Sequence, residues 1–191
     1  MARLTRKQVL RIVKYTRLKG KIARSAATES FIAGLENSTL VGANLERIDL
    51  IGADLAGANM QGVDLEDAKL QGANLAGADL FGSYLVGVGL EGANLTEAIL
   101  KRANLFGADL ESAILERANL QGANLEGVDL EGSNLSGANL QGTNLQGAYL
   151  SGANLHGANL EDIDLGGASY DSTTNWPETF DPEQAGAIRE D

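Results

Sequence analysis

The sequence places leucine at every fifth position over more than two thirds of its length. From Leu35 to Leu165 this spacing holds at 27 consecutive positions, with Met60 as the one exception and no insertion or deletion. A period of five matches neither the 3.6 residues of an α-helical turn nor the two-residue alternation of a strand. The chain must therefore turn once per repeat, so that short extended segments alternate with corners.

The residues around each leucine form the pattern A-[N/D]-L-x-G. Alternate residues of an extended segment share a face, so leucine and the preceding alanine should point inward and Asn or Asp outward. We expect the outward side chains to bond the local backbone or to form ladders rather than to bind ligands. Gly77 would supply the positive φ that the third residue of a type II turn, Leu75-Ala76-Gly77-Ala78, requires.

The string Ala73-Asn74-Leu75-Ala76-Gly77 and its repeats, over about residues 31–170, resemble the cyanobacterial-type pentapeptide-repeat family. Members of this family form a right-handed quadrilateral β-helix with four pentapeptides per coil. The resemblance implies an all-β solenoid with a 20-residue coil and just under seven coils. The larger residues in the inward alanine position agree with this period, because they fall on two adjacent faces. They are Ile48, Val88 and Val128 on one face and Val63, Thr143 and Ile163 on the next.

We expect three segments: a basic N-terminal helical arm or cap at residues 1–30, the solenoid at 31–170, and a C-terminal cap and tail at 171–191. A solenoid exposes unpaired backbone at its ends, so caps are expected. The C-terminal pattern T-x-W-P-x-x-F-D-P-x-x-A-G-A resembles the cap of many cyanobacterial-type members. Its candidate cap residues are Tyr170, Trp176 and Phe180, and the last two are expected to cover the final leucine layer.

The basic arm contrasts with an acidic remainder. Residues 1–24 carry nine Lys and Arg and no acid, whereas the rest of the chain has a net charge of −20. The segment Thr5 to Lys19 is predicted to form an amphipathic helix. It would cap the first coil, bind nucleic acid or another acidic surface, or act as a membrane-docking or targeting segment. The side chains concerned are Arg6, Lys7, Arg11, Lys14, Arg17 and Lys19.

The sequence lacks the residue combinations that catalysis and cofactor binding need. It has no cysteine and one histidine, His156, and its glycines follow the turn spacing. We therefore expect no enzyme activity, no metal and no cofactor. A convex rod offers no cleft in which carboxylates are desolvated, so perturbed pKa values are not expected. No apolar run is long enough to span a membrane or to form a secretory signal, and we expect a cytoplasmic protein.

Two surface regions depart from the repeat consensus. With a 20-residue coil, an acidic face is expected from Asp49, Glu91, Asp109, Glu111, Asp129 and Glu131. Solubility is a sufficient explanation for such a face. An exposed apolar patch is expected from Phe81, Tyr84, Val86, Ile99 and Phe106. Such a patch is typical of an interface, with a partner protein or with a second copy of the chain.

Three functional hypotheses follow. The first is a non-enzymatic structural or protein-interaction scaffold. Its protein partner is unidentified, and a second copy of the chain is one option. The second, implied by the family resemblance, is a DNA mimic that inhibits DNA gyrase or another topoisomerase. It is compatible with the 19 acidic and 5 basic residues between positions 31 and 170, although the basic arm opposes it. The third is binding of nucleic acid or an acidic surface through the basic arm.

Overall fold

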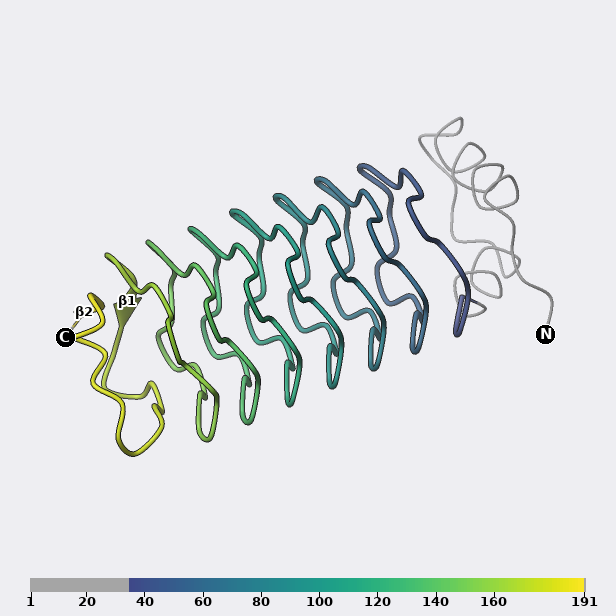
Figure 1. The fold of residues 1–191 in the computed structure, drawn as a ribbon. Helices are drawn as coiled ribbons and strands as arrows, with labels where there is room; N and C mark the ends of the chain where they lie inside the picture. Colours follow the sequence, from purple (N-terminus) through teal and green to yellow (C-terminus); the bar gives the residue numbers. More distant parts are fainter. Residues whose placement is uncertain (1–34, 191) are drawn as a thin grey trace.

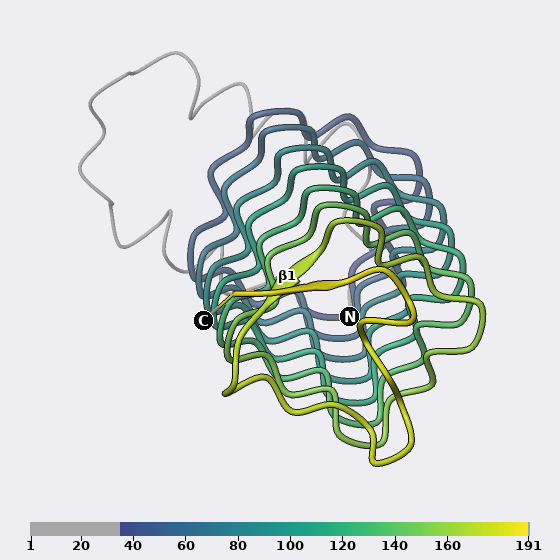
Figure 2. The same cartoon turned by 90° about the vertical axis from the view of Figure 1, so that its left-hand side faces the viewer.

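The computed structural model describes residues 35–190, which form a four-sided β-helix (Figure 1). Parallel bridges join outward residues to those 20 positions later, from Thr39 with Asn59 to Tyr149 with Ser169. The 20-residue coil is therefore confirmed, with one pentapeptide on each side (Figure 2). None of residues 35–190 is helical. The predicted helix and all six candidate side chains of the basic arm lie outside the described residues.

Each corner of the coil is a four-residue turn. The carbonyl of Leu75 accepts a hydrogen bond from the backbone N–H of Ala78 at 3.0 Å. Between them, Gly77 has a φ of 64°, as the third residue of a type II turn requires. The prediction for this glycine is confirmed. Within residues 35–190, eight non-glycine residues take the same left-handed conformation, namely Asn37, Arg47, Asp67, Glu97, Arg102, Ser112, Arg117 and Asp162.

The leucines of the repeat fill the interior of the coil. Every leucine of the five-residue series is buried, as is Met60. Val88, Val128 and Thr143, which replace alanine at the second inward position, are also buried, whereas Ile48 is only half-buried. Burying one leucine side chain contributes about 1.5–3 kcal/mol. The apolar column is therefore the main source of stability of the solenoid.

The outward Asn and Asp side chains link the coils to one another. Asn74 Oδ1 accepts a hydrogen bond from the backbone N–H of Ala76 at 3.3 Å. Its Nδ2 donates to Asp54 Oδ1 at 3.0 Å, and Asn94 Nδ2 donates in turn to Asn74 Oδ1 at 3.3 Å. The predicted backbone bonds and ladders are confirmed for this column.

The chain closes the C-terminal end of the rod with a short parallel pair of strands. Strand β1 spans Ser169–Tyr170 and β2 spans Ile188–Arg189, with Ser169 opposite Ile188. Strand β2 takes the place of a further coil, and the last segment crosses the end of the rod (Figure 2). Gly186 permits this approach, because a Cβ there would lie 3.3 Å from Cα of Gly166. Within residues 35–190, no helix has the length and apolarity needed to cross a bilayer.

Candidate functional site

The apolar patch lies midway along the solenoid, on one face and its two corners. Tyr84 is at the centre of this face, where it bridges Asn104 of the next coil. Backbone hydrogen bonds between coils place Val86 and Phe106 on successive coils at one corner. Phe81 lies at the other corner, three residues before Tyr84 in the chain. The face and both corners therefore contribute apolar side chains.

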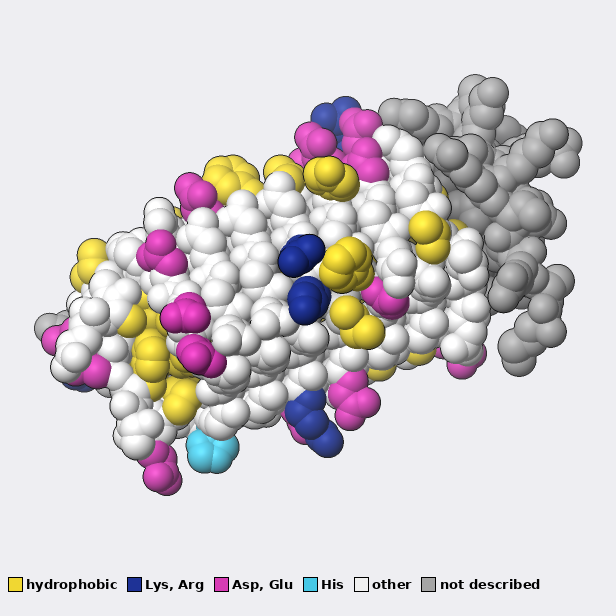
Figure 3. Space-filling model, viewed as in Figure 1, with side chains coloured by type: hydrophobic (Ala, Val, Ile, Leu, Met, Phe, Trp, Pro, Cys, Tyr) yellow, Lys and Arg dark blue, Asp and Glu magenta, His cyan; other side chains and the backbone are white. Residues whose placement is uncertain are grey.

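The patch continues around the corner to Ile99, which bridges Asp79 on the adjacent face. Tyr84 is 59% exposed and Phe106 47%; Phe81 and Ile99 are also exposed, and Val86 is half-buried. The structure thus brings all five candidate residues to two neighbouring faces, where they wrap a convex corner. Figure 3 shows apolar side chains gathered beside a pair of basic side chains midway along the rod.

Tyr84 interrupts an amide ladder. Asn144 Nδ2 donates to Asn124 Oδ1, and Asn124 Nδ2 donates to Asn104 Oδ1, each at 3.1 Å. Tyr84 occupies the next position of that column, where it cannot extend the ladder. The apolar side chain therefore replaces an amide that its neighbours use to join coils.

Other exposed apolar residues were missed by the sequence reasoning. Ile114 takes the outward Asn position on the face next to that of Ile99, and it is also exposed. Val41 and Tyr149 are exposed as well, in other coils. An isoleucine or tyrosine in the second position of the A-[N/D]-L-x-G pattern was a readable signal for two of these residues.

Opposite charges border the face that carries Tyr84. Lys101 lies directly on the coil after Phe81, because the backbone N–H of Gly82 donates to its carbonyl at 3.0 Å. Arg102 follows Lys101 in the same corner. The other corner carries Glu66 one coil before Val86, and Glu126 one coil after Phe106. One edge of the face is basic and the other is acidic.

The acidic face is built on stacked glutamates. Glu91, Glu111 and Glu131 lie on successive coils, joined by backbone hydrogen bonds of 2.8 Å between their turns. Asp109 and Asp129 bridge each other on the face beside them. These five of the six predicted residues come together.

Asp49 does not join this group. Lys69 and Gly89 separate it from Asp109 in the same column. The two aspartates share a column, but two coils lie between them.

The pKa of Glu111 is raised above its ordinary value. Partial desolvation is the largest cause, followed by the charges of Glu91, Asp129, Asp109 and Glu131. Successive coils lie about 4.8 Å apart, so like charges meet without any cleft. The expectation that no carboxylate would be perturbed is therefore wrong.

Three aromatic side chains gather at the C-terminal end. Tyr170 meets Trp176 edge to face, with ring centroids 5.5 Å apart and an interplanar angle of 89°. Trp176 stacks on Phe180 at 5.4 Å and 27°. Both Trp176 and Phe180 pack against the leucine core. The structure therefore places these three candidate cap residues at one end of the core.

Asp171 fixes the turn that follows β1. Its Oδ1 accepts hydrogen bonds from the backbone N–H of Thr173 at 2.9 Å, of Thr174 at 3.1 Å and of Gly152 at 3.1 Å. The Thr173 hydroxyl also donates to it at 2.7 Å. The bond from the Thr173 side chain is the largest cause that lowers the pKa of Asp171 to about 2. Sequence reasoning missed this residue, because its partners come from two separate coils.

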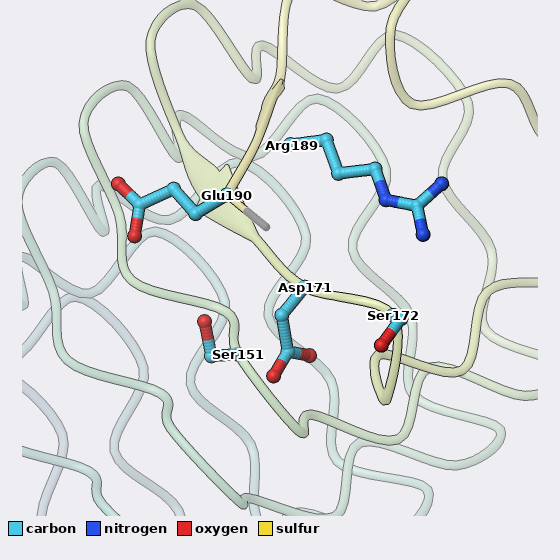
Figure 4. A pocket seen from close by; sticks show the side chains of 5 residues that line it. All are labelled: Ser151, Asp171, Ser172, Arg189 and Glu190. Carbon is cyan, nitrogen blue, oxygen red and sulfur yellow. The ribbon is translucent and has the colours of Figure 1, made fainter.

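A polar pocket of about 420 Å³ opens beside Asp171, lined by Ser151, Asp171, Ser172, Arg189 and Glu190. Figure 4 shows Arg189 and Glu190 extending away from each other. Asp171 is already engaged by the backbone of its own turn. The pocket therefore has the character of a gap in the cap. Within residues 35–190, no three His, Cys, Asp or Glu side chains are grouped as metal ligands.

The repeat is also recognised by comparison with known families. A family model described as "Pentapeptide repeats" matches the chain with eight copies. The matched residues are 33–67, 58–97, 73–112, 98–137 and 133–169. The chain belongs to the pentapeptide-repeat family. A search of curated proteins finds no significant match.

Solved pentapeptide-repeat structures resemble this solenoid. A pentapeptide-repeat protein from Nostoc PCC 7120 is 43% identical with a TM-score of 0.53, over 53% of this chain and 84% of that one. A pentapeptide-repeat protein of the Arabidopsis thaliana thylakoid lumen is 27% identical with a TM-score of 0.54, over 62% and 79% of the two chains. These neighbours imply that the β-helix is right-handed.

A third neighbour is QnrB1, a plasmid-mediated fluoroquinolone resistance protein. It is 21% identical with a TM-score of 0.39, over 72% of this chain and 74% of that one. Likeness at this level carries no argument about function.

Proposed function

We propose that this pentapeptide-repeat protein is a non-enzymatic scaffold that binds another protein chain through its apolar patch. The observation that carries the proposal is the exposure of Tyr84, Ile99 and Phe106 on one face of the rod and around its corners. Exposed aromatic and aliphatic side chains that gather on a surface are typical of interfaces. The stacked coils hold them in fixed positions, which lowers the entropy lost on binding.

The cost of the patch to the solenoid supports an interaction role. Asn in place of Tyr84 would be aligned with Asn104 and would extend the ladder, as Asn124 does. A net hydrogen bond contributes about 0.5–1.5 kcal/mol. The outward tyrosine forgoes that bond and leaves more than half of its surface exposed. A partner that covers the ring accounts for both features.

The repeat supplies a variant that removes the patch without harming the fold, Tyr84→Asn/Ile99→Asn/Phe106→Gln. Each new side chain is the one found in the same column at Asn104, Asn119 and Gln146. We expect the variant to keep the wild-type melting temperature or to exceed it. Loss of binding in this variant then reports on the surface and not on folding.

Photo-crosslinking tests the proposal. In one version of the protein a photo-reactive residue replaces Gln61, which lies one coil before Phe81 at the same corner. In the control version it replaces Gln141, which lies in the same column, two coils beyond Lys101. Full-length protein is irradiated in a lysate of cells that make it naturally. We expect adducts from position 61 that disappear in the triple variant, and none from position 141. Equal adducts from both positions, or none from position 61, would contradict the proposal.

A second candidate function is mimicry of DNA at a topoisomerase. It is supported by the carboxylates of Glu91, Glu111 and Glu131, which stack at about 4.8 Å like charges along a strand. The test is inhibition of gyrase supercoiling at micromolar protein, with Glu111→Gln/Glu131→Gln as the matched variant. Absence of inhibition by the wild-type protein eliminates this candidate.

A further inference from the structure

Two basic side chains beside the apolar patch, Lys101 and Arg102, indicate what kind of partner the patch accepts. We infer that this basic pair and the patch together form a docking site for an acidic segment of the partner protein, in which carboxylates stand next to an aromatic or aliphatic side chain. The inference rests on the proposed interaction function and names the chemistry of the partner. The basic pair binds the carboxylates, and the exposed side chains of the patch receive the apolar one.

Arg102 stands where most repeats have glycine. Its φ is 59°, in the left-handed region, whereas Gly82 and Gly122 hold that position in the coils before and after it. A non-glycine residue in this conformation is strained, and strained residues gather at functional sites. The Arg102 Cγ lies 4.0 Å from the place that a Cβ of Gly122 would take, so the side chain extends toward the next coil.

Strain alone does not single out Arg102, because Arg47 and Arg117 take the same backbone conformation. Each of these two arginines forms ion pairs with two acidic residues of the solenoid. Arg102 and Lys101 form no ion pair with any of residues 35–190. Arg102 is exposed and Lys101 is half-buried. Their charges are therefore available to carboxylates of another molecule, which a guanidinium binds with two parallel hydrogen bonds.

The surroundings of the basic pair are apolar or uncharged. One coil before it the corner carries Phe81, and one coil after it Gln121. Ile99 precedes the pair on the adjacent face. Asp79 lies one coil before Ile99, and its carboxylate accepts a hydrogen bond from the Gln61 side chain. Figure 3 shows basic side chains bordered by apolar ones midway along the rod. An acidic segment with an apolar side chain matches both parts of this surface.

The charges elsewhere on the solenoid favour a short acidic segment over a long polyanion. Glu66 and Glu126 lie at the opposite corner of the face that carries Tyr84, so carboxylates of the partner are repelled there and attracted at the basic pair. Residues 31–170 contain 19 acidic and 5 basic side chains. A nucleic acid that extends beyond the basic pair would meet this excess of negative charge.

The repeat supplies a variant that removes the basic pair and keeps the fold, Lys101→Gln/Arg102→Gly. Each new side chain is the one that the same corner carries one coil later. Glycine also relieves the left-handed backbone, so we expect no loss of melting temperature. The matched control, Arg47→Gly/Lys69→Asn, changes the net charge by the same amount in earlier coils.

The test is a selection of phage-displayed random peptides of about 12 residues on the immobilised full-length chain. Each enriched peptide is then measured against wild type, the variant and the control by fluorescence anisotropy. We expect peptides that bind wild type and control equally, and that bind Lys101→Gln/Arg102→Gly at least about tenfold more weakly because charge contacts are lost. These peptides should carry Asp or Glu next to an aromatic or aliphatic residue, and added NaCl should weaken them.

Three outcomes would overturn the acidic segment. They are a selection in which no peptide distinguishes wild type from Lys101→Gln/Arg102→Gly, distinguishing peptides that lack acidic residues, and a single-stranded DNA oligonucleotide that binds wild type and loses binding in this variant. Crosslinking from position 61 separates the inference from the function on which it rests. Adducts that disappear in the triple variant of the patch but persist without the basic pair keep the scaffold and exclude the acidic segment. No adduct from the wild-type chain contradicts the proposed function itself.

Discussion

Ser83 and Ser133 occupy the same inward position of their repeats, and both are only 1% exposed. The Ser133 hydroxyl donates a hydrogen bond to the carbonyl of Leu130 at 2.7 Å. Within residues 35–190, the Ser83 hydroxyl has no hydrogen-bond partner. Two chemically identical side chains in equivalent positions therefore make opposite contributions, since an unpaired hydroxyl loses its hydration without compensation.

Replacing these serines separates the two cases. Ser83→Ala removes an unsatisfied hydroxyl and inserts the alanine that most repeats carry, so we expect a gain of about 1 kcal/mol in the free energy of unfolding. Ser133→Ala removes the hydrogen bond to the carbonyl of Leu130, so it should be neutral or destabilising by a similar amount. Chemical denaturation of both variants measures the difference. Equal effects of the two substitutions would contradict the assignment.

Ser112 carries backbone strain that glycine would relieve. Its φ of 56° lies in the left-handed region, which costs a non-glycine residue about 1–2 kcal/mol. Ser112→Gly should therefore stabilise the solenoid by roughly 0.5–1 kcal/mol after the entropic cost of glycine is subtracted. Ser136→Gly is the control, because Ser136 occupies the preceding turn position without a positive φ. The control should lose stability in the same denaturation experiment.

The acidic face should make the protein less stable as the pH rises. The pKa of Glu111 is raised in the folded state, first by desolvation and then by its four acidic neighbours. The folded form is therefore favoured below the unfolded pKa, and that advantage disappears as the pH rises through the folded pKa. We expect Glu111→Gln to raise the melting temperature at pH 7 but not at pH 3.

Salt provides the control for this prediction. Added NaCl screens the neighbouring charges, so the gain of the Glu111→Gln variant at pH 7 should shrink in 1 M salt. A gain that persists unchanged at pH 3 would mean that the glutamine acts through packing or hydrogen bonding and not through charge.

The coil could be predicted because each repeat residue meets one local requirement. Leu75 must be buried, Gly77 must adopt a positive φ, and Asn74 must accept a hydrogen bond from the turn that follows it. The structure agrees in all three. None of these roles depends on a distant residue. The 20-residue coil was implied by the family resemblance, and the inward column agreed with it, because Val88 and Val128 are separated by two coils.

Features that depend on neighbours in other coils were less accessible. The perturbed pKa of Glu111 was missed because the sequence argument considered clefts and not stacking. Arg117 takes a left-handed turn conformation and also pairs with Glu116 at 2.6 Å, an ion pair that the repeat pattern does not predict. The pairing of β2 with β1 breaks the five-residue spacing, so no repeat arithmetic places Ile188 beside Ser169.

Asp171 should control the acid stability of the C-terminal cap. Its pKa is lowered to about 2, mainly by the bond from the Thr173 side chain. The stabilisation is therefore fully present above the ordinary aspartate pKa of 3.8 and is lost as the pH falls through about 2. Asp171→Asn should open the cap at a lower temperature than wild type at pH 7, and the two proteins should converge as the pH falls from about 4 to 2.

Fluorescence of Trp176, the only tryptophan of the chain, measures this opening directly. Trp176 stacks on Phe180 and packs against the core, so its emission should change when the cap separates from the last coil. Glu178→Gln is the control, since Glu178 is an exposed acid in the same segment. If Asp171→Asn and wild type lose the cap at the same temperature at pH 7, the hydrogen bonds of Asp171 do not hold the cap in place. In that case the aromatic contacts and the pairing of β2 with β1 hold it, and Trp176→Ala should open the cap while Asp171→Asn leaves it closed.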